Sequence, residues 1–256
     1  MTCTVTTAAE LYHIFDLLPV RQSVKIAGIH GIGKSEIVRE YTVGRNLNFN
    51  VIYLGQCELT DIKGLPLLNT KEAITQWLKG VWWPKTNGDK DGGVLLLEEF
   101  NRAPHDVQAV ALELANEGTL DGEALPENWR VVICVNEFGD YITNTPDPAV
   151  TDRFFHIKFQ PSVDGWLSHA RALEVSPAII NFIAAYPACL DPADKLDPQL
   201  KYQSRRSWFR VDAVIKANDL LKRPITAEAR HDLRIAAQGW LGESTATAFS
   251  AYIDAN

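Results

Sequence analysis

Short apolar runs alternate with amphipathic segments over the first part of the chain. Strands are expected at residues 23–27, 50–54, 94–97, 130–135 and 154–159. Runs without a polar face, such as 94–97, are typical of parallel strands that are covered on both sides. Apolar side chains recur at helical spacing in residues 8–18, 35–41 and 104–118. Strands that alternate with helices predict a doubly wound parallel α/β sheet, with its ligand at the carboxyl ends of the strands.

The pattern changes after Pro161, where strand-like runs end and helical periodicity continues. Helices are expected at residues 166–173, 177–186, 207–221 and 227–241. A chain of 256 residues accommodates one large α/β domain and one small helical domain. We therefore expect an α/β domain at residues 1–160 and a small all-α domain at residues 161–256.

Composition and charge restrict the class of protein. An apolar fraction of 46% supports a substantial core. No apolar run reaches the length of about 18 residues that a membrane span needs. The first residues lack a basic region followed by an apolar one, so no secretory signal is expected. The net charge of −7 argues against nonspecific nucleic-acid binding by overall charge, although a local basic patch would not show in this total.

The four cysteines are far apart and form no C-x-x-C pair. They are Cys3, Cys57, Cys134 and Cys189. This spacing argues against a zinc site and against a disulfide scaffold. We expect buried or incidental thiols in a reducing cytoplasm.

Residues 28–35 read Gly-Ile-His-Gly-Ile-Gly-Lys-Ser and fit the phosphate-binding loop G-x-x-x-x-G-K-[ST]. A strand is expected before the loop and a helix after it, which disfavours an ordinary glycine-rich turn. Backbone N–H groups in such a loop surround phosphate oxygens at a helix N-terminus. Lys34 would reach the β- and γ-phosphates, and the Ser35 hydroxyl would bind Mg²⁺. The expected nucleotide-binding residues are Gly28, His30, Gly31, Ile32, Gly33, Lys34, Ser35 and Glu36.

Two carboxylates, Glu98 and Glu99, follow the apolar run at 94–97. Beside a phosphate-binding loop, such acids complete a magnesium shell and polarise a water molecule. We expect Glu98 to face the metal through water and Glu99 to orient the attacking water as general base. Two ordinary surface acids are the alternative, which the neighbouring loop disfavours.

Further polar residues stand where the expected strands and helices begin or end. Asn136 ends the strand at 130–135 and either contacts the γ-phosphate or the attacking water, or forms a turn with the residues that follow. Arg153 either pairs with Asp152 or projects to the nucleotide of a neighbouring subunit as an arginine finger. Arg205 and Arg206 open a helix of the second domain, where one of them could reach the phosphates; adjacent arginines also fit a solvated helix face.

The order of these pieces resembles that of the AAA+ ATPases, and specifically of the MoxR-like group. The segment at 95–104, Leu-Leu-Leu-Glu-Glu-Phe-Asn-Arg-Ala-Pro, resembles the Walker B pattern L-x-D-E-I-N-R-A-P of that group. Residues 61–66 resemble its D-L-x-G-x-P loop, 147–154 its D-P-A-L-x-x-R-F motif and 204–208 its S-P-R-S-W motif. The resemblance covers residues 8 to 221 and implies an AAA+ α/β domain followed by a helical lid.

The resemblance also implies roles for single residues. Asn136 falls at sensor 1, Arg153 at the arginine finger and Arg206 at sensor 2, and Arg102 could contribute across a subunit interface. Glu98 departs from the usual aspartate, and its extra methylene moves the carboxylate by about 1.5 Å. Because magnesium demands near-ideal octahedral geometry, this departure could slow hydrolysis. Arg205 replaces a proline, which leaves the choice between Arg205 and Arg206 open.

We therefore expect an ATPase that uses ATP and Mg²⁺ and assembles into a ring, a hexamer in the favoured case. ATP is favoured over GTP because no N-K-x-D motif occurs. The resemblance implies that the ring remodels or activates a client protein, with a von Willebrand factor A domain supplied by another chain. One alternative is a nucleic-acid motor or restriction-type subunit; the other is a slow or non-hydrolysing structural ring, which Glu98 keeps open.

The tryptophans allow two interpretations. Trp77, Trp82 and Trp83 are either pore-loop or partner-contact residues of a ring, or packing residues of an inserted element, and packing is favoured. The remaining tryptophans are expected in the core: Trp129, Trp166, Trp208 and Trp240.

Overall fold

The structure, a computed structural model, describes residues 3–85, 90, 92–136, 152–192, 200–222 and 224–256. The chain folds into two compact units. The first consists of Met1–His30 with Lys34–Gln160, and the second of Gly31–Gly33 with Pro161–Asn256. Each unit has its own apolar core, one built around the central strands and the other around Trp208.

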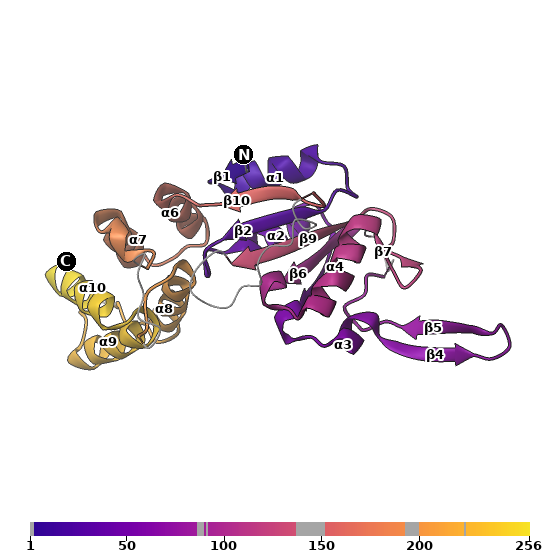
Figure 1. The fold of residues 1–256 in the computed structure, drawn as a ribbon. Helices are drawn as coiled ribbons and strands as arrows, with labels where there is room; N and C mark the ends of the chain where they lie inside the picture. Colours follow the sequence, from indigo (N-terminus) through magenta and orange to yellow (C-terminus); the bar gives the residue numbers. More distant parts are fainter. Residues whose placement is uncertain (1–2, 86–89, 91, 137–151, 193–199, 223) are drawn as a thin grey trace. The chain divides into compact units, whose positions relative to one another are not determined.

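A parallel sheet forms the centre of the first unit (Figure 1). Its six strands run in the order β1-β10-β2-β9-β6-β3, and every neighbouring pair is parallel. The strands are β1 (Cys3–Val5), β2 (Val24–Gly28), β3 (Asn48–Tyr53), β6 (Gly93–Glu98), β9 (Trp129–Asn136) and β10 (Phe155–Phe159). Every residue of β6 is buried, as its apolar run at 94–97 predicts for that part of the strand. The doubly wound α/β class is confirmed.

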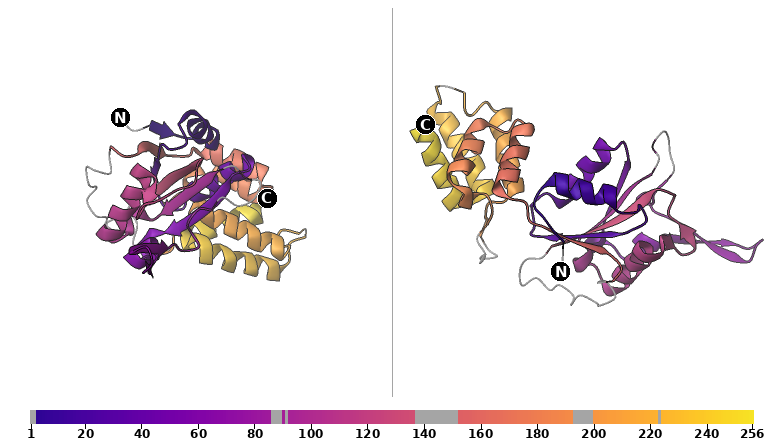
Figure 2. Two further views of the ribbon diagram at one scale, coloured as in Figure 1. Left: turned by 90° about the vertical axis from the view of Figure 1, so that its right-hand side faces the viewer. Right: turned by 90° about the horizontal axis from the view of Figure 1, so that it is seen from above.

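Helices cover both faces of this sheet (Figure 2). Helices α1 (Ala8–Leu17) and α2 (Lys34–Gly44) lie on one face, and α4 (His105–Glu117) lies on the other. A capping box of Thr7 and Glu10 begins α1, and each side chain accepts a backbone N–H of the other residue. Helix α4 ends at Gly118, whose φ of 65° is the left-handed conformation that glycine adopts at helix ends.

The hydrophobic pattern of the sequence does not predict several short elements of the first unit. They are the edge strand β1, the hairpin of β4 (Leu65–Asn69) with β5 (Ile74–Leu78), the two-residue strands β7 (Thr119–Leu120) and β8 (Glu123–Ala124), the helix α3 (Leu59–Lys63) and the 3₁₀ turns η1 (Leu54–Gln56) and η2 (Phe100–Arg102). Elements of two to five residues are too short for a period to appear. Both hairpins form small antiparallel sheets of their own.

The second unit consists of helices in the part that the structure describes. They are α6 (Val163–Ala172), α7 (Pro177–Ala185), η3 (Pro187–Cys189), α8 (Arg205–Ala217), α9 (Ala227–Leu241) and α10 (Glu243–Ala255). The expected helix at 227–241 coincides with α9. Helix α10 was not expected, because serine, threonine and alanine dominate it and only Ala246, Phe249 and Ile253 mark its buried apolar side.

The tryptophans follow the expectations with one exception. Trp129, Trp166 and Trp208 are buried, but the expectation for Trp240 was wrong: its side chain is 40% exposed. Leu233, Ala237 and Leu241 form the buried side of α9, and Trp240 lies at its flank.

The packing interpretation fits the tryptophans near the inserted hairpin. Trp83 belongs to the core, and Trp82 packs edge-to-face against it with ring centroids 5.5 Å apart. Within the described ranges, no helix has both the length and the apolar character needed to cross a membrane.

Candidate functional site

The carboxyl ends of three neighbouring strands bring polar groups to one edge of the sheet. Gly28 ends β2, Asn136 ends β9 and Glu98 ends β6. Gly28 and Asn136 are register partners, and β9 also pairs with β6. Because parallel strands present their carboxyl ends at one edge, these three residues share that edge of the first unit.

Lys34 is the first residue of α2 and holds its ammonium at this edge. Its Nζ donates to the carbonyl oxygens of Gly28 and Ile29, at 2.9 Å each, and to Oδ1 of Asn136 at 2.8 Å. The residue is only 7% exposed. These three acceptors are neutral oxygens, so a phosphate anion offers the ammonium a stronger partner.

The Ser35 hydroxyl donates to Oε1 of Glu98, so both oxygen groups expected near Mg²⁺ meet directly. Glu98 is 8% exposed. Magnesium prefers hard oxygen ligands and is commonly bound by one or two carboxylates together with substrate phosphates. The described residues contain no group of three or more His, Cys, Asp or Glu side chains that could hold a metal by themselves. The donor set at Ser35 and Glu98 thus fits a magnesium ion that arrives with a nucleotide.

The loop between β2 and α2 depends on glycine at two positions. Gly31 and Gly33 have φ values of 81° and 93°, in the region that strains other residues. A Cβ at Gly33 would meet nothing within 4 Å, so backbone conformation rather than space requires glycine there. Among the other expected phosphate-binding residues, Ile32 is buried, whereas His30 and Glu36 are exposed.

Glu99 turns the chain sharply after β6. Its φ of 56° and ψ of 32° are left-handed, a conformation that costs a non-glycine residue about 1–2 kcal/mol. Its Oε1 accepts from Nη1 of Arg102 at 3.2 Å. The carboxylate also lies against Gly55, where an added Cβ would come within 2.9 Å of Oε2. The expected general base is thus positioned by a strained turn, a glycine and an arginine of its own chain.

Asn101 is a site residue whose role the sequence reasoning did not identify. Its Nδ2 donates to the Asn136 carbonyl at 3.1 Å and ties the turn after β6 to the end of β9. Its Oδ1 is buried and accepts no hydrogen bond from the described residues. The signal was an amide three residues after the first strand-end acid.

Cys134 lies beneath this edge in β9 and is buried. Burial raises the pKa of its thiol well above the ordinary value, the charge of Glu98 raises it further, and Lys34 opposes the shift. The thiol therefore stays protonated at neutral pH and is not a nucleophile.

The expected arginine finger lies two residues before β10. Arg153 is exposed, whereas Phe154 next to it is buried. Residues 147–151 of its motif, and the turn considered after Asn136, lie outside the described residues.

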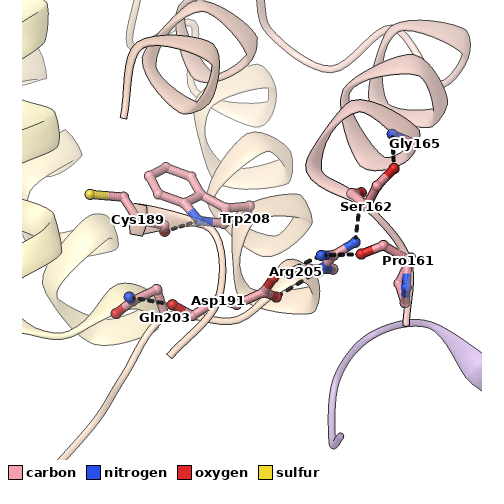
Figure 3. A network of polar contacts seen from close by, with 8 residues as sticks. All are labelled: Pro161, Ser162, Gly165, Cys189, Asp191, Gln203, Arg205 and Trp208. Atoms are coloured by element: carbon pink, nitrogen blue, oxygen red, sulfur yellow. Dashed lines mark hydrogen bonds and ion pairs between the residues drawn. The ribbon is translucent and has the colours of Figure 1, made fainter. Parts of the chain in front are cut away.

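The two adjacent arginines of the second unit have different surroundings, and Figure 3 shows those of Arg205. Arg205 is 6% exposed, and its Nε and Nη2 donate to Oδ1 and Oδ2 of Asp191 at 2.8 and 2.7 Å. Its Nη2 and Nη1 also donate to the carbonyls of Pro161 and Ser162, at 2.7 and 3.2 Å. Arg206 is exposed. Because Arg205 is committed to packing within its own unit, Arg206 stays the predicted sensor 2.

Comparisons with known proteins bear on the family and on the fold. The sequence matches the family model of the AAA domain (dynein-related subfamily) over residues 23–154, and no curated protein matches it. A proposed ATPase from Cytophaga hutchinsonii ATCC 33406 is 16% identical, with a TM-score of 0.50 over 98% of this chain and 90% of that chain. The Thermotoga maritima RuvB Holliday junction branch migration motor is 14% identical, with a TM-score of 0.48 over 91% and 68%.

At such identities a structural likeness speaks for the fold alone. The family match spans the phosphate-binding loop, the acids that end β6, the amide that ends β9 and the residues up to β10. It therefore covers every element that builds the site in the first unit. The chain belongs to the AAA domain family, in its dynein-related subfamily.

Proposed function

We propose that the protein binds ATP with Mg²⁺, hydrolyses it and uses the energy, as a MoxR-like ring, to remodel a client protein. The convergence of Lys34, Ser35, Glu98 and Asn136 at one sheet edge carries the proposal. These side chains supply a cation for phosphate, oxygen ligands for magnesium and an amide beside both. Membership of the AAA domain family supports nucleotide use in general.

In this proposal each residue has a separate task. Lys34 would exchange its neutral acceptors for phosphate oxygens, and Ser35 and Glu98 would hold the metal. Bound Mg²⁺ supplies electrostatic stabilisation of the charge that develops on the transferred phosphoryl group. Glu99 orients the attacking water and accepts its proton, and Asn136 holds the water or the terminal phosphate by its amide. Arg206 senses the nucleotide from the second unit.

Arg153 is the reason to propose a ring. An exposed arginine two residues before β10 is available to a nucleotide held by a second copy of the chain, as in the MoxR-like proteins that the sequence resembles. We propose a hexamer whose nucleotide sites lie between subunits, with a von Willebrand factor A domain protein as separate partner. Hydrolysis would then change the angle between the two units and move the client.

Complementation between two inactive variants tests this proposal. Lys34→Ala and Arg153→Ala are each expected to lack ATPase activity, because one cannot grip the phosphates and the other cannot complete a neighbour's site. Mixed in equal amounts, they should recover part of the wild-type turnover, since some interfaces combine an intact Lys34 with an intact Arg153.

The control for this mixture is each variant mixed with itself, with co-assembly confirmed by pull-down between differently tagged chains. Mixed assemblies that stay inactive would refute a finger that acts across the interface. Full turnover by a monomer would refute the ring.

The slow or non-hydrolysing ring is the second candidate, and the contact between Ser35 and Glu98 bears on it. The glutamate already reaches the serine hydroxyl, and an aspartate would hold its carboxylate about 1.5 Å farther back. We therefore expect Glu98→Asp to lower turnover about tenfold, as measured by phosphate release at saturating Mg·ATP. A large gain in turnover would instead favour the dormant ring.

A further inference from the structure

The hairpin of β4 and β5 is an arm that extends from the α/β body of the first unit (Figure 1). Its strands pair with each other in a separate two-stranded sheet. Much of its apolar surface is exposed: Leu65 is 64%, Leu68 73% and Leu78 58% exposed. An isolated two-stranded hairpin is marginally stable in water. The position of the arm therefore depends on what holds its base.

The carboxylate of Asp121 forms ion pairs with a lysine at each end of the arm. Lys63 ends α3 one residue before Gly64 leads into β4, and Lys79 immediately follows β5. Their ammonium groups lie 2.7 and 3.0 Å from Oδ1 and Oδ2 of Asp121. The side chains of Lys79 and Asp121 are only 5% and 10% exposed. Asp121 and Gly122, with φ values of 52° and 81°, form the two-residue turn between β7 and β8.

Aromatic rings support the two lysines at this junction. Lys63 Nζ lies 5.6 Å from the ring centroid of Trp77 in β5, and Lys79 Nζ lies 5.3 Å from that of Trp83 in the core. Both separations fit cation–π attraction. Burial alone would raise the pKa of Asp121, but hydrogen bonds from the lysines outweigh it and leave that pKa lowered. The carboxylate is therefore charged at neutral pH.

Asp121 also stands at the far end of an element that starts at the candidate site. Glu98, Glu99 and η2 lead directly into α4, whose 13 residues span about 20 Å. Helix α4 ends at Gly118, and β7 and the Asp121 turn follow at once. If α4 moves as a rigid element, a displacement of its first turn would also displace the Asp121 turn at the base of the arm.

We propose that Asp121 is a joint that couples the β4–β5 arm, through α4, to the nucleotide site. The coupling rests on the proposed function, whereas the anchoring of the arm does not. When both lysines are bound to Asp121, the arm moves together with the β7–β8 turn. Without the carboxylate, the buried Lys79 ammonium and the partly buried Lys63 ammonium repel each other, and the arm loses its fixed orientation.

Hydrogen exchange of the full chain, followed by mass spectrometry, tests the anchor without nucleotide. Asp121→Asn is expected to speed exchange of the amides at residues 65–78 about tenfold, while those of β6 and β9 stay protected. Asp219→Asn is a matched control: it removes the same charge at a φ of 50° in the second unit and should leave the arm unchanged. Equal exchange of the arm in wild type and Asp121→Asn would overturn the anchor.

The same measurement with ATPγS and Mg²⁺ tests the coupling. Arm exchange should change on binding in wild type and not in Asp121→Asn, although both bind the nucleotide. The same response in both, or no response in wild type with ATPγS bound, would overturn the coupling. Failure of wild type to bind ATPγS would refute the proposed function and the coupling with it, while the nucleotide-free comparison still decides the anchor.

A second variant covers the case in which Asp121→Asn does not fold. Lys63→Gln removes the more exposed of the two ion pairs, because the Lys63 side chain is 28% exposed. It should speed exchange of the arm by a smaller factor. An arm whose exchange is unaffected by this change would contradict the joint as well.

Discussion

Glu99→Gln is expected to lower ATP turnover by about 10²–10⁴-fold, the usual worth of a general base. Glutamine keeps the size and the left-handed turn of Glu99 but cannot accept the proton of the attacking water. Its amide oxygen can still accept from Arg102, so the local geometry should persist. Phosphate release under saturating Mg·ATP measures turnover, and equilibrium binding of Mg·ATP should stay near the wild-type value.

Glu113→Gln serves as its control. Glu113 is an exposed residue of α4, so the same chemical change there should leave turnover unaltered. Glu99→Gln with wild-type turnover would show that another group activates the water. If Glu99→Gln lost Mg·ATP binding as well as turnover, Glu99 would be needed for nucleotide binding and not for activation of the water.

Trp208→Ala should destabilise the second unit by about 3–5 kcal/mol, the range for large-to-small changes in a core. The side chain is fully buried, and its indole N–H donates to the Cys189 carbonyl at 3.0 Å. Its ring packs against Phe249 and Phe182 with centroids 5.3 and 5.6 Å away. Alanine would leave a cavity between these rings and a carbonyl without its donor.

Trp240→Ala removes the same side chain from a 40% exposed position and is the control. It should lower the free energy of unfolding by less than about 1 kcal/mol. Urea unfolding followed by far-ultraviolet circular dichroism yields both free energies of unfolding. Equal losses for the two variants would mean that Trp208 is not the centre of this core.

The centre of the sheet was predictable because β6 is buried along its whole length and β9 along most of it. An uninterrupted apolar sequence marked β6, and the same character marked β9. The convergence of Glu98 and Asn136 followed, since parallel strands present their carboxyl ends at one edge. The β4–β5 arm was not predictable. Its leucines are exposed, and its sequence shows no alternation of apolar and polar residues that would mark a strand with one buried face.

The side-chain junctions were less accessible to sequence reasoning. Lys63, Lys79 and Asp121 are far apart in the chain, so only the fold reveals that they share one charge cluster. The choice between Arg205 and Arg206 did have a signal. Arg205 lies three residues before Trp208, so helical spacing puts these two on the same buried side of α8.

The connection that enters the second unit at Pro161 has little torsional freedom. The amide of Gln160 donates to the Val5 carbonyl at 2.9 Å, which holds this residue to the edge strand β1. The carbonyls of the next two residues are held by Arg205. The proline ring fixes φ at residue 161, and a residue before proline is biased toward extended backbone. The backbone on each side of the peptide between Gln160 and Pro161 is thus fixed within its own unit, so few bonds of the chain rotate freely where it passes from one unit to the other.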